Sequence, residues 1–178
     1  MSNSLLKLLK AGNHVLVNGN IEGVLPDLSD IMEHFVPKAE EGSPRALILC
    51  ISDDQVRLIG ECLKDRAKDL DLTIDLITDK GNKLKQRNDL FDGTEVIIGS
   101  VKRTTEMYFQ NGFNMAKIKF VAILDTDQMM RQALKGHLTR LSESLPKCRI
   151  LITAVNAEEE RLLDFQEQFF TPIVGIDI

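Results

Sequence analysis

Short apolar runs recur along the chain and are separated by longer segments with helical periodicity. Because the apolar residues are nearly continuous rather than alternating with polar ones, each run is typical of a parallel strand covered on both faces. The runs occupy residues 14–18, 45–51, 73–78, 95–99, 120–125 and 149–155, and residues 171–178 are expected to add an edge strand. Strand–helix alternation implies right-handed crossovers. The sequence therefore predicts an α/β fold, a three-layer α/β/α domain with a mostly parallel sheet.

Four helix boundaries are legible between these runs. Ser52 and Gln55 form a capping box, S-x-x-Q, ahead of apolar residues at helical spacing. Leucines at 134, 138, 141 and 145 line one face of another helix, which Pro146 should end. Asn156 is expected to cap a third helix, with three glutamates in its first turn, and Pro26 lies near the start of a fourth.

The length and charge of the chain limit the possible classes of protein. With 178 residues and 43% hydrophobic content, we expect one domain over residues 1–178 with no second lobe. Lys7 and Lys10 interrupt the first apolar stretch, so we expect no signal peptide and no membrane span, and a cytoplasmic protein. The net charge of −5 weighs against bulk electrostatic binding of nucleic acid, which would need a local basic patch.

The cysteines and histidines do not predict a metal site. Cys50, Cys62 and Cys148 lie far apart and form no C-x-x-C motif, so buried thiols are the expectation. The three histidines have no partner at metal-ligand spacing either.

The segment after the first predicted strand, NGNIEGV, has the glycines of a phosphate-binding loop without its charges. Gly19 and Gly23 could form the turn, but Val24 and Leu25 occupy the region where Lys and Thr would hold phosphates and magnesium. No Gly-Lys dipeptide occurs anywhere in the chain. A strand-to-helix turn without a ligand is therefore favoured over a phosphate site.

The fourth strand end, IIGSVKRTTE, groups cations and hydroxyls. Ser100, Lys102 and Arg103 lie there, and Lys80 and Lys83 lie in the preceding loop. These side chains suit contacts to a phosphodiester backbone, whereas a solvated helix start explains them equally well.

Asp125 follows the fifth strand, and Thr153 lies at the end of the sixth. A carboxylate at the end of a strand can hold magnesium when phosphate oxygens complete its ligands. Without a phosphate-binding Lys, Asp125 is expected instead to cap the turn or the helix that follows.

Taken in order, these blocks resemble the first RecA-like lobe of DEAD-box RNA helicases over essentially the whole chain. GNHVLVNGNIEG resembles the ATP-binding strand and loop, and RALILCISDDQVRLI resembles the strand and helix start of P-T-R-E-L-A. TEVIIGSVKRT is similar to the T-P-G-R segment, FVAILDTDQMM to the D-E-A-D segment and CRILITAV to the S-A-T strand. The closing FFTPIVGIDI is similar to the family's last helix-to-strand segment. The resemblance implies a RecA-like fold of the P-loop NTPase type.

The resemblance also implies that most of the family's ATP chemistry is missing. Val24 and Leu25 stand at the ATP-binding Lys and Thr positions, and Thr126 stands at the catalytic Glu position. The remnant of the nucleotide site is Gly19, Gly23, Asp125 and Thr153. The implied nucleic-acid contacts are retained best, with Arg103 at the T-P-G-R arginine and Ser100 at its threonine.

The leading hypothesis is a non-catalytic helicase-like module, a pseudoenzyme with no cofactor and no metal, that binds RNA or a protein partner. One alternative is an ATP-dependent helicase lobe with residual nucleotide binding that works with another chain. Another is a structural or scaffolding protein. A GTPase or dinucleotide enzyme is set aside because G-K-[ST] and G-x-G-x-x-G are both absent from the sequence.

Overall fold

The computed structural model describes residues 2–178, in which helices and strands alternate almost throughout. The strands are β1 (His14–Asn18), β2 (Ala46–Cys50), β3 (Ile74–Ile77), β4 (Val96–Ser100), β5 (Phe120–Ile123), β6 (Arg149–Ala154) and β7 (Ile173–Asp177). The helices are α1 (Ser2–Lys10), α2 (Leu25–Phe35), α3 (Asp53–Asp69), α4 (Lys83–Phe91), α5 (Val101–Phe109), α6 (Thr126–Arg131), α7 (Lys135–Glu143) and α8 (Glu160–Phe169). A short 3-10 helix, η1 (Ile21–Gly23), lies between β1 and α2.

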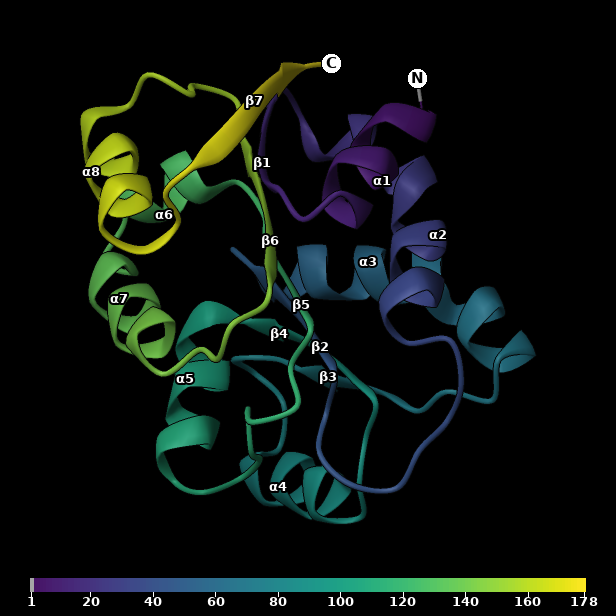
Figure 1. The fold of residues 1–178 in the computed structure, drawn as a ribbon. Helices are drawn as coiled ribbons and strands as arrows, with labels where there is room; N and C mark the ends of the chain where they lie inside the picture. The colour runs from purple at the N-terminus through teal and green to yellow at the C-terminus, as the bar shows by residue number, and fades with distance from the viewer. Residues whose placement is uncertain (1) are drawn as a thin grey trace.

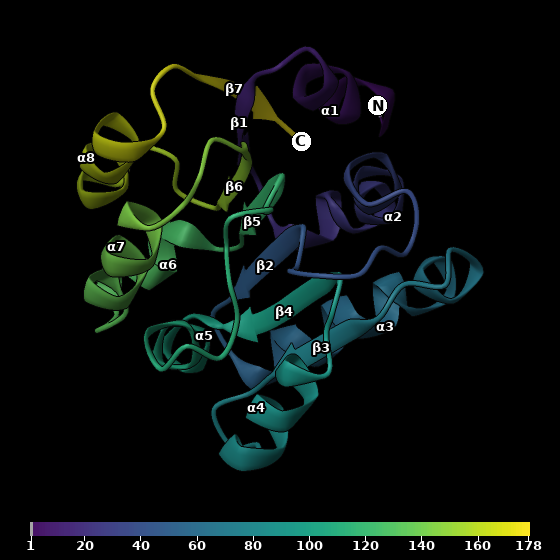
Figure 2. The same cartoon turned by 60° about the horizontal axis from the view of Figure 1, so that its bottom comes forward.

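The seven strands form one sheet in the order β3-β4-β2-β5-β6-β1-β7 (Figures 1 and 2). Every neighbouring pair is parallel, so the predicted α/β fold with a parallel sheet is confirmed. The segment 171–178 supplies β7, which pairs with β1 as an edge strand. The carboxyl ends of β2, β5, β6, β1 and β7 therefore lie side by side along one edge of the sheet.

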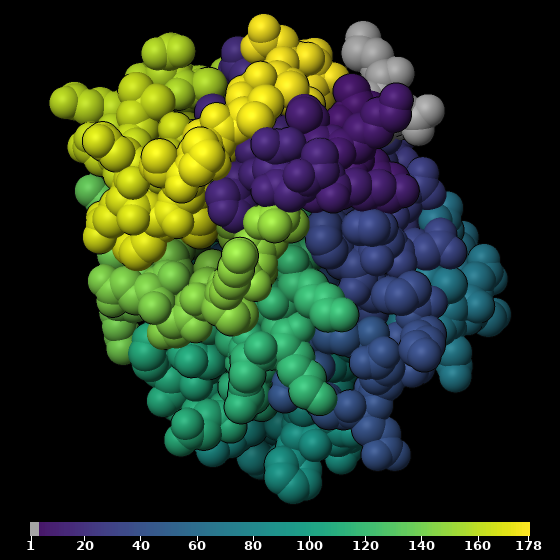
Figure 3. All heavy atoms as spheres, viewed as in Figure 1, coloured from purple at the N-terminus to yellow at the C-terminus, as the bar shows by residue number. Residues whose placement is uncertain are grey.

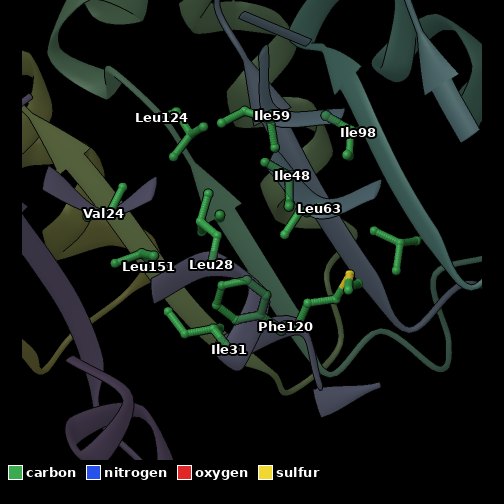
Figure 4. Close-up of a cluster of buried hydrophobic side chains, with 14 of the residues drawn as sticks. Val24, Leu28, Ile31, Ile48, Ile59, Leu63, Ile98, Phe120, Leu124 and Leu151 are labelled. Carbon is green, nitrogen blue, oxygen red and sulfur yellow. The ribbon is translucent and has the colours of Figure 1, made fainter. Parts of the chain in front are cut away.

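Helices cover both faces of the sheet, as the continuous apolar runs predict (Figure 1). The cluster on one face joins α1, α2 and α3 to the sheet, and Phe120 lies within it, stacked on Phe35 with ring centroids 5.1 Å apart (Figure 4). The cluster on the other face is built by α5, α6, α7 and α8. Each apolar strand is thus buried between two layers of helix, which is the three-layer arrangement.

Two of the predicted helix starts can be compared with the structure. Ser52 caps α3 by accepting a hydrogen bond from the backbone N–H of Gln55 at 3.2 Å, as predicted. The prediction that Asn156 caps a helix is wrong. The Asn156 side chain accepts from the N–H of Glu158 and closes a separate turn, and α8 begins later, where the side chain of Glu159 accepts from Leu162.

The cysteines are free thiols: Cys50 and Cys148 are buried and Cys62 is partly buried. Burial raises the pKa of the Cys148 thiol to about 11 and raises the pKa of the Cys50 thiol further, so both stay protonated at neutral pH. Within residues 2–178, no three His, Cys, Asp or Glu side chains are grouped as metal ligands. A search of the same residues finds no helix with the length and hydrophobicity needed to cross a membrane.

Candidate nucleotide and nucleic-acid sites

The loop after β1 closes on itself through its own backbone. Asn20 precedes η1, and the amides of Gly23 and Val24 donate to the carbonyls of Asn20 and Ile21 at 3.0 and 2.9 Å. At the start of the loop, the amide of Gly19 donates to the carbonyl of Ala154 on β6 at 2.9 Å. A phosphate-binding loop directs its amides at the anion. Three amides of this loop donate instead to carbonyls of the protein.

Hydrophobic side chains fill the surroundings of the same loop. Val24 is fully buried in the cluster beneath α2, where it lies near Leu28 and Leu151 (Figure 4). On the outer side, Ile178 packs against the two glycines: a Cβ added to Gly23 would lie 3.2 Å from Ile178 Cγ2. The C-terminal segment lies against the N-terminal helix on this surface (Figure 3). The loop is thus packed from both sides.

Asp125 adopts a left-handed backbone conformation, with φ 52° and ψ 46°, at the junction of β5 and α6. Its N–H donates to Thr153 Oγ1 at 2.8 Å, which ties this turn to β6. Its carboxylate accepts from Gln55 Nε2 at 2.9 Å, and Gln55 Oε1 in turn accepts from the N–H of Ile51. The expectation that Asp125 caps the following helix is wrong, because its side chain makes no cap bond to α6 and contacts Gln55 instead.

Thr126 and Asp127 are fully buried next to this turn. The hydroxyl of Thr126 donates to the carbonyl of Ile123 at 2.9 Å, so it points into the protein. Asp127 Oδ2 accepts from the N–H of Asn156 at 2.9 Å and fixes the turn after β6, whereas Asp127 Oδ1 has no hydrogen-bond partner within residues 2–178. Both side chains therefore brace the strand ends from inside.

The pKa of Asp125 is raised, first by burial and then by the nearby charge of Asp127, while the hydrogen bond from Gln55 opposes the shift. Stability contributed by a raised carboxyl is present at low pH and is lost as pH rises through its folded-state pKa. We expect Asp125→Asn, which keeps an acceptor for Gln55 and tolerates the left-handed region, to be more stable than wild type at pH 7.

The stability advantage of Asp125→Asn should shrink toward pH 4, near the ordinary pKa of Asp, in urea denaturation at a series of pH values. Asp125→Ala is the control, because it loses the acceptor and places Ala in the left-handed region at a cost of about 1–2 kcal/mol. A stability difference between Asp125→Asn and wild type that does not change with pH would contradict this assignment.

Ser100 and the turn before α4 are joined by hydrogen bonds. Ser100 Oγ donates to Asp79 Oδ1 at 2.7 Å. The carboxylate of Asp53, at the start of α3, accepts from the backbone amides of Asp79 and Lys80 at 2.8 and 3.1 Å. Three segments far apart in the sequence are fastened together at the carboxyl ends of β2, β3 and β4.

Arg103 is the centre of this network. Its Nη1 donates to the carbonyl of Gly81 and to Gln86 Oε1, both at 3.0 Å, and its Nη2 donates to the carbonyl of Asp79 at 2.6 Å. Its Nε lies 3.6 Å from Glu106 Oε2, and the side chain is only 15% exposed. The guanidinium therefore holds the turn before α4 and directs its donors into the protein.

The lysines of the predicted nucleic-acid site surround this network. Lys83 Nζ lies 3.9 Å from the same Glu106 carboxylate that faces Arg103. Lys80 and Lys102 have exposed side chains, and no hydrogen bond or ion pair within the described chain involves their ammonium groups. The structure therefore places Lys80, Lys83, Ser100, Lys102 and Arg103 around one turn, but leaves only Lys80 and Lys102 unpaired.

Sequence reasoning missed three residues that organise these sites. Gln55 was read only as part of a capping box, yet it also bonds Asp125. Asp79 and Gln86 were given no role, although both bind Arg103 or Ser100. Their partners are about 70 residues away for Gln55 and about 20 for the other two, so no local pattern reveals them.

The fold matches solved DEAD-box proteins. An ATP-dependent RNA helicase of Sulfolobus tokodaii, described as hypothetical, has a TM-score of 0.86 at 12% identity, and the match covers 99% of this chain and 51% of that one. A DEAD box protein of Methanococcus jannaschii has a TM-score of 0.87 at 14% identity, covering 97% and 47%. The yeast splicing factor Prp28 has a TM-score of 0.82 at 12% identity, covering 93% and 42%.

The chain folds as a RecA-like lobe of the DEAD-box type. It spans about half the length of the helicase structures that it matches. No family model and no curated protein matches the sequence. In this RecA-like lobe, the Gly19–Gly23 loop and the turn at Asp125 both lie at the carboxyl edge of the sheet, where ligands of open α/β sheets bind.

Proposed function

We propose that the chain is a non-catalytic DEAD-box helicase-like module whose nucleotide site no longer holds Mg-ATP. The observation that carries this proposal is the closed Gly19–Gly23 loop. Its amides are paired within the protein, Ile178 packs on Gly23, and Val24 is buried where a phosphate-binding Lys would need to reach outward. A phosphate group would have to open this packing and would find no cation there.

The other half of the site supports the same proposal. Asp125 is occupied by Gln55, and the hydroxyl of Thr126 is turned inward to Ile123. Magnesium bound to a nucleotide takes one or two carboxylates together with phosphate oxygens, and a second acid positions the attacking water. The residues present do not fit a Mg-nucleotide, so we propose no cofactor and no hydrolytic step.

A module without hydrolysis acts by binding, and we propose that its partner is RNA or a protein. The exposed, unpaired Lys80 and Lys102 support RNA binding at the turn before α4. Protein binding has a parallel in a yeast structure of the same fold, Dbp5, which is described as bound to Nup159 and Gle1. The net charge of −5 makes any RNA contact local.

Calorimetry with Mg-ATP and Mg-ADP tests the nucleotide half of the proposal. We expect no heat of binding at nucleotide concentrations up to about 1 mM, because a bound phosphate would lack its lysine and its amide cradle. Micromolar binding of either nucleotide would overturn the proposal.

Fluorescence anisotropy with single-stranded RNA at two salt concentrations tests the RNA half. Lys80→Ala/Lys102→Ala should weaken binding at low salt and flatten the salt dependence by about one to two charges. Lys147→Ala, which removes an exposed cation in the loop before β6, is the matched control. Negligible binding by wild type, or equal binding by all three proteins, would rule RNA out and leave the protein partner.

One observation favours a second candidate, an ATP-dependent helicase lobe with residual nucleotide affinity that works with another chain. The hydrogen bond from Asp125 to Thr153 joins the two strand ends that the D-E-A-D and S-A-T segments occupy. The calorimetry above separates this candidate from the first. A scaffolding role is a third candidate, with β3 and β7 as the sheet edges available for pairing.

A further inference from the structure

Phe91, the last residue of α4, is the most exposed large hydrophobic side chain among the described residues. It is 88% exposed. Gly93 adopts a positive φ of 100° and donates its N–H to the carbonyl of Leu90, so the chain turns away directly after Phe91. Phe91 therefore projects from the end of α4, which lies at the end of the molecule away from α1 and β7 (Figure 1).

Two hollows share Phe91 as a common wall. The first, which we call the aromatic hollow, has a volume of about 730 Å³ and includes Tyr108, Phe109 and Phe113 in its lining. The second, which we call the acidic hollow, has a volume of about 580 Å³ and lies among Glu40, Glu41, Asp92 and Glu95. Both lie at the amino ends of the strands, away from the nucleotide and nucleic-acid sites.

The aromatic hollow offers ring faces to a ligand. Tyr108 packs against Phe109 and Phe113 with ring centroids 5.1 and 5.5 Å apart. The guanidinium of Arg140 lies 4.2 Å from the centroid of Phe109. This end of the molecule thus already holds one guanidinium on an exposed aromatic ring, by the cation–π attraction that a ligand cation would use on Phe91.

The acidic hollow has carboxylates without counter-charges. Glu40 lies 3.8 Å from the buried guanidinium of Arg45, and Glu95 accepts from the N–H of Thr73. By contrast, the carboxylates of Glu41 and Asp92 make no hydrogen bond or ion pair within residues 2–178. Lys117 lies nearby, beside Gly42, but does not line the hollow. Two uncompensated acids next to an exposed Phe attract a cation and repel the phosphates of RNA.

We propose that Phe91 and its two hollows dock a segment of a partner protein that carries an apolar side chain close to Lys or Arg. The apolar side chain enters the aromatic hollow, and the cation stacks on Phe91 and faces Glu41 and Asp92. An exposed aromatic ring flanked by pockets is the kind of residue that dominates the binding energy of protein interfaces. This surface works independently of the nucleotide site, so it stands or falls apart from the function proposed above.

Selection from a display library of random 12-residue peptides tests the proposal. Wild-type protein should enrich peptides with an apolar residue within a few positions of Lys or Arg. The enriched peptide should bind Phe91→Ala at least tenfold more weakly and Glu41→Lys/Asp92→Lys several-fold more weakly in fluorescence anisotropy. Leu84→Ala is the matched control, because Leu84 is 68% exposed on the same helix and lines neither hollow, and it should bind like wild type.

Three outcomes would overturn the proposal. The first is the absence of enrichment, or an enriched consensus without cations. The second is equal peptide binding by wild type and Phe91→Ala. The third is that Phe91→Ala abolishes a concentration-dependent dimer in solution or weakens the binding of single-stranded RNA, which would make a second copy or RNA the occupant. The substituted side chains are exposed, so loss of folding does not confuse the result.

Discussion

Val24→Lys is expected to destabilise the protein by about 3–5 kcal/mol and to gain no binding of Mg-ATP. In an intact phosphate-binding loop this change would restore the missing lysine. Here Val24 is fully buried beside Leu28 and Leu151, so the new ammonium would be desolvated among hydrophobic side chains with no anion to pair. Urea denaturation measures the loss of stability, and calorimetry measures the nucleotide.

Two controls separate the charge from the change of shape. Val24→Thr matches the size of Val and buries only a hydroxyl, so it should lose about 1–3 kcal/mol. Leu25→Thr restores the other missing residue at a half-buried position and should lose less than Val24→Lys. If Val24→Lys were as stable as wild type and bound Mg-ATP, the loop would be an open phosphate site and the non-catalytic proposal would fail.

Arg103→Ala should lower the free energy of unfolding by about 2–3 kcal/mol, although the resemblance to the T-P-G-R segment assigns this residue to RNA. The substitution removes the donors that bind Asp79, Gly81 and Gln86 and leaves their oxygen atoms without a partner. Chemical denaturation gives the stability, and hydrogen exchange should show faster exchange in the turn at residues 78–82.

Lys102→Ala is the adjacent control for Arg103→Ala. Its side chain is exposed and unpaired, so its removal should change stability by less than about 0.5 kcal/mol. Arg103→Lys should recover little, because an ammonium cannot reproduce the planar set of donors. Equal stability of Arg103→Ala and Lys102→Ala would mean that the guanidinium is free in solution and available to RNA.

The layered fold could be predicted from the sequence because its signal is local. Each apolar run is continuous over five to seven residues, which is enough to indicate a buried strand, and the capping box at Ser52 is complete within four residues. The error at Asn156 is also local in origin. An Asn after a strand suits a helix cap and an isolated turn equally, and the choice depends on Asp127, which binds the N–H of Asn156 from α6.

The candidate sites could be located from the sequence, since the residues that follow parallel strands gather at one edge of the sheet. Their state could not be inferred in the same way. The pairing of Arg103 with Gly81 and Gln86, the contact of Gln55 with Asp125 and the packing of Ile178 on Gly23 all join residues from different elements. Such contacts depend on how the elements pack, which no spacing of residues records.

The sequence by itself therefore determined the class of fold, the strand ends that matter and the missing charges at Val24, Leu25 and Thr126. Only the tertiary structure decided that the loop is closed rather than merely altered, that Arg103 faces inward, and that Phe91 stands exposed between two hollows. The physical reason is that secondary structure follows from the periodicity of neighbouring residues. Burial and hydrogen-bond satisfaction depend instead on which distant segments the sheet brings together.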